Sequence, residues 1–196
     1  KYTSGHVTQV ELSPDNNITQ QVLDEGLVIK GDIFIDCTGF RQTLMNSLPN
    51  QSFVSYAQEL RNDSAVTLAS PMADSTIAPQ TTSTALNNGW AWQIPLRNRY
   101  GNGYVYSSRY TDDKTAEKEL RHLIGQEHAD TAPRHLQFNL GRLSHHWHHN
   151  CLAVGLSQGF IEPLEATALL LIQQTLGKFV DAYRRGHYSN KFQSEF

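Results

Sequence analysis

The residues best suited to chemistry lie near the C-terminal end of this 196-residue chain, where residues 162–168 read EPLEATA. Glu162 and Glu165 come directly before a long apolar run with the spacing of a helix. The first turn of a helix offers unpaired backbone N–H groups and a partial positive charge, and it therefore attracts anions. A glutamate beside that end is placed to exchange a proton with a bound ligand. The alternative is an acidic first turn that does no chemistry.

Two tryptophans lie close together in residues 89–96, which read GWAWQIPL. Trp90 and Trp92 are two positions apart, and this spacing places both on one face of a strand. A tryptophan pair is most often part of a hydrophobic core, because tryptophans are heavily buried on average. The pattern alone therefore favours a packing role.

A run of histidines at residues 145–149, HHWHH, invites a metal-site interpretation. Along a strand, His145 and His149 would face one way, and His146 and His148 the other. No nearby cysteine or carboxylate completes a tetrahedral set of ligands. We therefore predict no metal site here, and interpret the histidines as polar strand residues next to a cleft.

Composition excludes several classes of function. The apolar content of 39% is enough for a core. The formal charge of −3 means that the chain lacks the basic excess of a nucleic-acid or membrane-surface protein. No apolar run reaches membrane-spanning length, and the first residues lack the apolar stretch of a signal peptide. Cys37 and Cys151 lie far apart, which favours two buried thiols in a reducing cytoplasm over a disulfide.

The chain is expected to form mostly short strands. Residues 7–12 and 18–23 alternate apolar and polar around the turn cluster SPDNN, which predicts an antiparallel hairpin followed by a strand at 27–30. Residues 33–37 are apolar except Asp36, which predicts a strand covered on both faces. Further strands are expected at 65–69, 81–86, 89–96, 103–108, 137–142 and 147–154, with a turn at 97–102.

Two helices complete the prediction. Asp112 is a suitable N-cap for an amphipathic helix over residues 114–126. A second, longer helix follows the EPLEATA segment, and RRG at 184–186 supplies a cationic last turn and a terminating glycine. The inward positions are expected to be Leu120, Leu123 and Ile124 in the first helix, and Leu164, Ala168, Leu171, Ile172, Thr175, Leu176, Phe179, Val180 and Tyr183 in the second.

Three segments, taken in this order, resemble the flavin-dependent tryptophan halogenase family. Residues 35–40 read IDCTGF and are similar to the strand end that approaches the flavin in that family. Residues 90–95 read WAWQIP and match its W-x-W-x-I-P signature, and residues 162–167 match its E-P-L-E-[SA]-T segment. The likeness extends over nearly the whole chain at compatible spacings.

The resemblance implies an α+β fold. It would be part of an FAD-binding fold of the glutathione-reductase and monooxygenase kind, with an antiparallel substrate-side sheet and a long helix. Residues 1–48 would belong to the FAD-binding domain, 49–150 to the substrate-side sheet with one helix, and 151–196 would return to the FAD-binding domain. The chain has no G-x-G-x-x-G dinucleotide fingerprint. The family's essential lysine lies upstream of the matched part, so we expect an internal fragment that is inactive alone.

The resemblance also implies roles for individual residues. Glu165, and not Glu162, matches the catalytic glutamate, which would stabilise the cation formed in aromatic substitution and accept its proton. The backbone N–H groups of Thr167 and Ala168 match the family's halide donors, which requires the regular helix to begin near residue 166 or 167 and not at Pro163. Flavin contacts are expected from Thr38, Gly39, Phe40, Gly155 and Gly159, and a partition between flavin and substrate from Trp90, Trp92, Ile94 and Pro95.

The implied reaction uses reduced FAD from a separate flavin reductase, chloride or bromide, and a small aromatic substrate. Neither nucleic acid nor membrane is an expected partner. Family members that act on free tryptophan usually read E-S-T-G where this chain reads EATA at 165–168, so an indole, a phenol, a pyrrole or a tethered substrate all remain open. A flavin monooxygenase and a catalytically inactive flavoprotein that acts as a binding partner are the alternatives. The paired tryptophans and Glu165 argue against the first, and a missing upstream lysine would favour the second.

Overall fold

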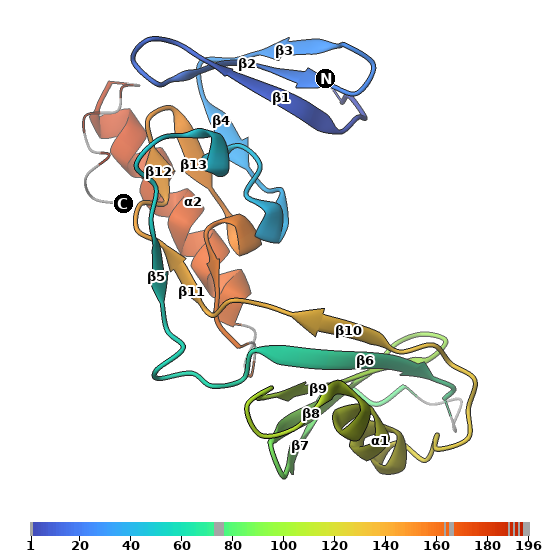
Figure 1. The fold of residues 1–196 in the computed structure, drawn as a ribbon. Helices are drawn as coiled ribbons and strands as arrows, with labels where there is room; N and C mark the ends of the chain where they lie inside the picture. The colour runs from blue at the N-terminus through green and yellow to red at the C-terminus, as the bar shows by residue number, and fades with distance from the viewer. Residues whose placement is uncertain are drawn as a thin grey trace. The chain divides into compact units, whose positions relative to one another are not determined.

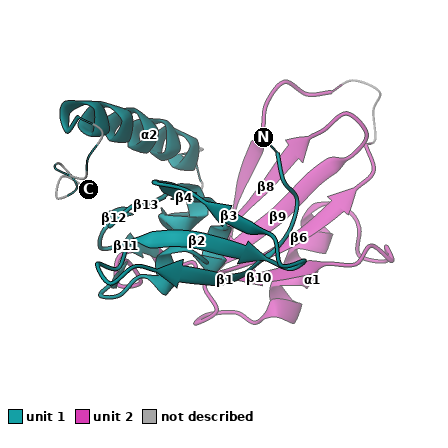
Figure 2. Ribbon diagram, turned by 90° about the horizontal axis from the view of Figure 1, so that it is seen from above, with its two compact units in different colours: residues 1–55, 141–196 teal, residues 56–140 magenta. Residues whose placement is uncertain are grey.

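The computed structural model describes residues 2–72, 77–162, 164, 167–187, 189, 191 and 193. Its fold is a mixture of antiparallel sheets, one parallel strand pair and two α-helices among the described residues (Figure 1). The chain divides into two compact units, residues 1–55 with 141–196 and residues 56–140 (Figure 2). These boundaries differ by several residues from the predicted ones at 48/49 and 150/151. The FAD-binding and substrate-side roles of the segments stay predictions.

The first unit begins with a three-stranded antiparallel meander, which confirms the predicted hairpin and the strand after it. β1 (Val7–Leu12), β2 (Ile18–Leu23) and β3 (Val28–Lys30) pair in chain order. The turn between β1 and β2 is closed because the backbone N–H of Ser13 donates to the carbonyl of Asn17 at 2.8 Å, and Asn17 N–H donates to Ser13 Oγ at 3.1 Å. Short polar side chains of this kind favour such turns.

Two further sheets in this unit bring distant segments of the chain together. β4 (Phe34–Asp36) lies parallel to β13 (Cys151–Ala153), and β13 pairs on its other edge with the two-residue strand β12 (Trp147–His148). A strand early in the chain thus ends beside a strand more than 110 residues later. The remaining sheet has the order β14-β11-β5 and contains β5 (Phe53–Ser55), β11 (Gly141–Leu143) and β14 (Gly159–Phe160).

The long helix α2 (Thr167–Arg185) packs along β12 and β13 (Figure 1). Its Phe179 meets the fully buried ring of Trp147 edge-on, with 4.8 Å between ring centroids. Thr175 and Phe179 are buried as predicted, which confirms that one face of the helix packs against the rest of the unit. The inward face is narrower than predicted, because four of the residues assigned to it are exposed: Leu164, Leu171, Leu176 and Val180.

The second unit is a five-stranded antiparallel sheet in the order β10-β6-β9-β8-β7, with α1 on one face. Asp112 caps α1 as predicted, since its Oδ1 accepts the backbone N–H of Thr115 at 2.7 Å. Leu120 is fully buried against the sheet, but Leu123 is exposed and not inward as predicted. The elements are β6 (Ser64–Ser70), β7 (Thr82–Leu86), β8 (Gly89–Pro95), β9 (Tyr100–Tyr106), β10 (Arg134–Gln137) and α1 (Asp113–Leu123).

Several predicted boundaries are wrong. The turn before β9 is shorter than 97–102, because buried Asn102 lies within the strand and donates to Leu68 O and Ser70 Oγ. The strand predicted at 147–154 is a hairpin, because the chain reverses at His149, which has a positive φ of 51°. The segment predicted as one strand at 137–142 contains the last residue of β10 and the first two residues of β11, with a connection between them.

The prediction that residues 33–37 form a strand covered on both faces is also wrong. Phe34 and Asp36 are buried, whereas Ile35 is 48% exposed and Cys37 is exposed. β4 is an edge strand of its sheet, and only one of its faces is covered by described residues. The prediction of two buried thiols therefore holds for Cys151 alone.

No helix among the described residues has the length and apolar character that a membrane crossing requires.

Candidate functional site

Two loops lie side by side in the first unit because they follow two parallel strands. β4 pairs with β13 in the register Asp36 to Ala153, so the carboxyl ends of the two strands meet at one edge. The first loop continues into the 3-10 helix η1 (Gly39–Arg41), and the second into the 3-10 helix η3 (Gly155–Ser157). The carboxyl ends of parallel strands are where ligands bind in open α/β sheets. Four of the five predicted flavin contacts, Thr38, Gly39, Phe40 and Gly155, lie in these loops.

The carboxylate of Asp36, which is fully buried, holds this edge of the sheet together. Its Oδ1 accepts the backbone N–H of Thr38 at 2.9 Å, the hydroxyl of Thr38 at 2.7 Å and the hydroxyl of Ser157 at 3.0 Å. Its Oδ2 accepts the backbone N–H groups of Leu44 and Met45, both at 2.9 Å. Five donors on one buried carboxylate satisfy its charge without a cationic partner. Asp36 was given no role from the sequence, although a single acid within an apolar strand is a signal of one.

Ser157 joins the two loops directly. Its buried Oγ accepts the backbone N–H of Gly39 at 2.9 Å while it donates to Asp36. The side chain of Gln42 adds a second link, since its Nε2 donates to the carbonyl oxygen of Ser157 at 3.1 Å. The loops are therefore positioned by protein groups before any ligand binds.

The glycines of the loops explain how a ligand could approach the backbone. Gly39 has a φ of +72°, and a Cβ built on it would meet no atom of the described residues within 4 Å. Glycine adopts that conformation without strain and leaves the space above it open. Phe40 beside it is 54% exposed and meets Phe160 edge-on, with ring centroids 5.5 Å apart. An open backbone beside an exposed ring fits a flat aromatic cofactor such as a flavin.

Gly159 has a different explanation. A Cβ at this position would lie 2.5 Å from the carbonyl oxygen of Gly141 and 2.7 Å from the Cα of Arg142. Glycine is required here because β14 lies very close to β11. Its contact with flavin stays a prediction.

The two thiols near this edge are unsuited to nucleophilic chemistry. Burial raises the pKa of the Cys151 thiol to about 12. Burial, with a smaller effect from the Asp36 carboxylate, also raises the pKa of Cys37. Both therefore remain protonated near neutral pH, and a thiol is a far weaker nucleophile than a thiolate.

The predicted halide donors lie at the first two positions of α2. The described part of the helix begins at Thr167, and Leu164 lies in a turn before it, so the regular helix starts after Leu164 as predicted; residues 165 and 166 lie outside the described residues. The N–H groups of the first helical turn have no partner within the helix. Glu165, the predicted catalytic residue, lies outside the described residues, and its role stays a prediction.

The tryptophan pair lies in the second unit and is not part of its core. Trp90 and Trp92 are half-buried, with ring centroids 5.8 Å apart. The intervening residue, Ala91, points to the opposite face and packs in the core that α1 covers. Ile94 follows on the tryptophan face and is 38% exposed, and Pro95 ends the strand. The pair therefore lies outside the buried core, and the two half-buried rings form a partly accessible aromatic surface.

The ring of Trp92 lies over the backbone of Gly103, its cross-strand neighbour on β9. A Cβ at Gly103 would be 2.0 Å from Trp92 Cζ2, so only glycine admits this ring position. We expect Gly103→Ala to displace the Trp92 ring and to lower the free energy of unfolding by about 1–3 kcal/mol. Urea denaturation and near-UV circular dichroism of the tryptophan pair would measure both effects.

Gly101→Ala is the matched control for this prediction. It lies two residues away on the same strand and face, and a Cβ there would meet Leu96 Cδ1 at an ordinary 3.6 Å. We expect this control to leave the tryptophan signal unchanged. Equal effects of the two substitutions would show that Gly103 does not set the position of Trp92.

The histidine run does not alternate along a strand as predicted. His148 contacts both His145 and His149, with centroid distances of 5.7 and 4.4 Å, so these three rings lie together. His146 turns away, and its Nδ1 lies 2.8 Å from the side-chain nitrogen of Gln158. The alternation failed because only Trp147 and His148 are in β12. No group of three or more His, Cys, Asp or Glu residues that could hold a metal occurs in the described part of the chain.

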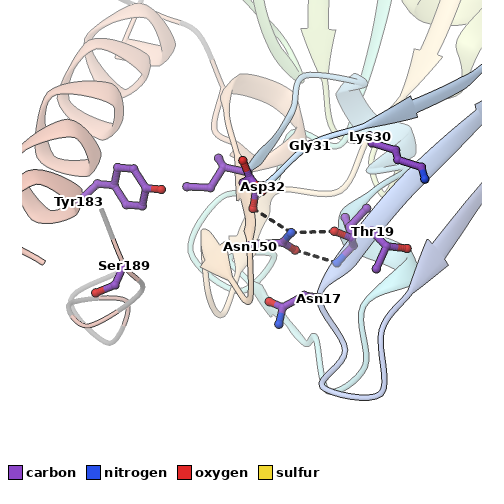
Figure 3. Close-up of a pocket in the computed structure, with 10 residues that line it drawn as sticks. Asn17, Thr19, Lys30, Gly31, Asp32, Asn150, Tyr183 and Ser189 are labelled. Atoms are coloured by element: carbon purple, nitrogen blue, oxygen red, sulfur yellow. Dashed lines mark hydrogen bonds between the residues drawn. The ribbon is translucent and has the colours of Figure 1, made fainter. Parts of the chain in front are cut away.

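A separate pocket of about 840 Å³ lies in the first unit, and its lining residues do not belong to the two loops (Figure 3). Asn150 forms its centre, with Oδ1 accepting Ile18 N–H at 2.7 Å and Nδ2 donating to the carbonyls of Ile18 and Asp32 at 2.8 and 3.1 Å. Tyr183 of α2 contributes another wall. None of the predicted site residues lines it, and Asn150 is occupied in joining the meander to β4.

Comparison with known proteins gives a consistent result. The sequence model of the family described as tryptophan halogenase matches residues 1–196. A tryptophan 6-halogenase from Streptomyces toxytricini is 41% identical over 190 residues, which cover 96% of this chain and 36% of that protein. The crystal structure of a tryptophan halogenase from Shewanella frigidimarina matches with a TM-score of 0.85 at 36% identity, covering 97% of this chain and 38% of the other. The structure of a flavin-dependent halogenase from Xanthomonas campestris matches with a TM-score of 0.84 at 37% identity, and the match covers 92% of this chain and 36% of that one.

The chain therefore spans little more than a third of the length of the proteins that it matches.

Proposed function

This chain belongs to the tryptophan halogenase family, and we propose that the protein that contains it catalyses FAD-dependent chlorination or bromination of an electron-rich aromatic ring. The observation that carries the proposal is the match of the whole chain to the family, with all three motif segments present in order. The finer fold assignment is part of the proposal. The first unit would be the part of the FAD-binding domain that follows the dinucleotide fingerprint, and the second unit the substrate-side sheet.

The loops after β4 and β13 fit the flavin ring. Gly39 leaves space above its backbone, Phe40 is exposed beside it, and Asp36 with Ser157 holds both loops in place. Bound FAD, reduced by a separate flavin reductase, would supply hypohalous acid from oxygen and halide. The protein's task is then to bind halide at the flavin, to keep substrate away from it, and to assist substitution on the ring.

Each of these tasks has a proposed residue. The backbone N–H groups of Thr167 and Ala168 would hold the halide, because a helix N-terminus favours anions. Trp90 and Trp92 would separate substrate from flavin, which their accessible position on the sheet supports. Glu165 would stabilise the positive charge on the substituted ring and remove its proton.

The substrate class is proposed as a small electron-rich aromatic such as an indole. The related proteins named above act on tryptophan or are described as flavin-dependent halogenases. Ala166 and Ala168 differ from the serine and glycine usual in enzymes for free tryptophan, so tryptophan itself is one candidate among indoles, phenols and pyrroles.

The direct test uses the full-length protein with FAD, a flavin reductase and either halide. Tryptophan, indole, a phenol and a pyrrole are offered separately, and products are identified by mass spectrometry. A product with one hydrogen replaced by chlorine or bromine supports the proposal. Hydroxylated product instead would indicate a monooxygenase, and no product with any substrate would indicate an inactive flavoprotein.

The halide position gives a structural prediction. In crystals of the full-length protein soaked in bromide, we expect an anomalous peak against the backbone of Thr167 and Ala168, because these N–H groups lie at the start of α2. A soak in chloride is the control and removes the peak. A strong bromide peak elsewhere in the flavin cleft, with none at α2, would contradict the assignment.

A further inference from the structure

A chain of side-chain hydrogen bonds joins α2 to the second loop of the candidate site. The hydroxyl of Thr175 donates to Gln158 Oε1 at 3.1 Å, and Gln158 Nε2 donates to His146 Nδ1 at 2.8 Å. Thr175 and Gln158 are buried, with 7% and 9% of their surfaces exposed. A hydroxyl on the buried face of a helix is costly unless it is paired. This network therefore has to be kept intact when α2 packs.

The two ends of the Thr175–Gln158 hydrogen bond flank the proposed halide donors in the sequence. Gln158 directly follows η3, and Thr175 lies two turns into α2, about 12 Å along the helix from Thr167. The side chain of Ile172, one turn before Thr175, lies near Gly155, since a Cβ built on that glycine would meet Ile172 Cδ1 at an ordinary 3.5 Å. The first turns of α2 are thus held beside the loop after β13 by the Thr175–Gln158 hydrogen bond, with Ile172 next to Gly155.

The side-chain amide of Gln158 lies between His146 and Thr175. Burial, with smaller effects from Arg142 and His145, lowers the pKa of His146 to about 4, so its ring is neutral near pH 7. With its proton on Nε2, the neutral ring accepts the amide N–H at Nδ1, and Oε1 of Gln158 faces Thr175. The backbone of Gln158 is also fixed, since its N–H donates to Gly155 O at 2.9 Å and its carbonyl accepts Leu143 N–H at 2.9 Å.

We infer that Gln158 is a positioning residue, which through Thr175 sets the start of α2 against the Gly155–Ser157 loop and so places the Thr167 and Ala168 N–H groups at the flavin. The inference rests on the proposed function for its effect on halide, but the positioning itself is a statement about this chain alone. Neither Gln158 nor Thr175 is among the proposed halide contacts. Their loss should therefore weaken halide binding more than it slows the steps that follow.

The test compares Thr175→Val with Thr175→Ser in the full-length protein. Valine keeps the shape and removes the hydroxyl, whereas serine keeps the hydroxyl. The net free-energy contribution of one neutral hydrogen bond corresponds to a change of about fivefold in an equilibrium constant. We expect Thr175→Val to raise the KM for bromide about fivefold with kcat changed less than about twofold, and Thr175→Ser to stay near wild type.

Gln158→Met and the double variant complete the experiment. Both single variants break the same hydrogen bond, so the double variant should raise the bromide KM no more than the larger single effect. Gln174→Met, an exposed position next to Thr175 on α2, is the control and should change nothing. Equal effects of valine and serine at Thr175, or additive effects in the double variant, would overturn the inference.

Hydrogen exchange separates this inference from the proposed function. In the full-length protein, Thr175→Val should speed amide exchange in residues 155–160 and in α2, and Thr175→Ser should not. If the wild-type protein makes no halogenated product, the proposed function fails, and faster exchange in the valine variant alone still supports the positioning role. Unchanged exchange in these segments would overturn it whatever the activity.

Discussion

Glu165→Gln in the full-length protein is expected to lower the rate of halogenation by about 100-fold or more, since a positioned acid or base contributes about that factor. Glutamine keeps the size of the side chain but can neither hold a negative charge beside a cationic ring nor accept its proton. FAD affinity should be unchanged, because the flavin contacts proposed here lie in the loops after β4 and β13. Turnover is measured by mass spectrometry of the halogenated product, and FAD binding by fluorescence titration.

Glu162→Gln is the matched control for that variant. It makes the same chemical change three residues earlier in the same segment. We expect the control to keep most of the wild-type rate. A rate near wild type for Glu165→Gln, or a larger loss for Glu162→Gln, would show that the catalytic role was given to the wrong glutamate.

Asp36→Asn is expected to have the largest effect on stability. The wild-type carboxylate accepts hydrogen bonds from five donors in a fully buried position. An amide turns one acceptor oxygen into a donor, which would face either the N–H groups of Leu44 and Met45 or the hydroxyls of Thr38 and Ser157. Leaving buried donors unpaired costs about 1–3 kcal/mol each, so we expect a loss of roughly 2–5 kcal/mol in the free energy of unfolding.

The same substitution should weaken FAD binding, because the two loops lose their common acceptor. Urea denaturation gives the stability and fluorescence titration gives the FAD affinity. Asp32→Asn is the control, because Asp32 lies only four residues before Asp36 and is exposed. A surface substitution of this kind usually changes the free energy of unfolding by no more than about 0.5 kcal/mol. If Asp36→Asn proves as stable as the control and binds FAD equally well, Asp36 does not organise this edge.

Local patterns in the sequence predicted most elements correctly. The alternation in β1 and β2, the turn cluster between them and the Asp112 cap of α1 depend on residues close together in the chain. A start of α2 after Leu164 was also predicted correctly, and this prediction came from the family resemblance and not from Pro163, which by itself indicates an earlier start.

The errors occurred where a distant residue decides the local structure. His149 and Asn150 form a turn inside the segment predicted as one strand, because Asn150 binds the backbone of Ile18 and Asp32, more than 110 residues away. Asn102 looks like a turn residue but is held in β9 by Leu68 and Ser70. The partners of Asn150 and Asn102 lie too far away in the chain to be recognised from the residues next to them.

The sequence by itself determined the family, the order of the three motif segments and the residue types available for chemistry. Only the tertiary structure decided which of these residues are brought together. The parallel pairing of β4 with β13 makes Asp36 a common acceptor for two loops, the face of β8 opposite Ala91 leaves the tryptophans accessible, and the packing of α2 joins Thr175 to Gln158. The physical reason is that burial and hydrogen bonding depend on neighbours in space, and these neighbours come from segments that are far apart in the chain.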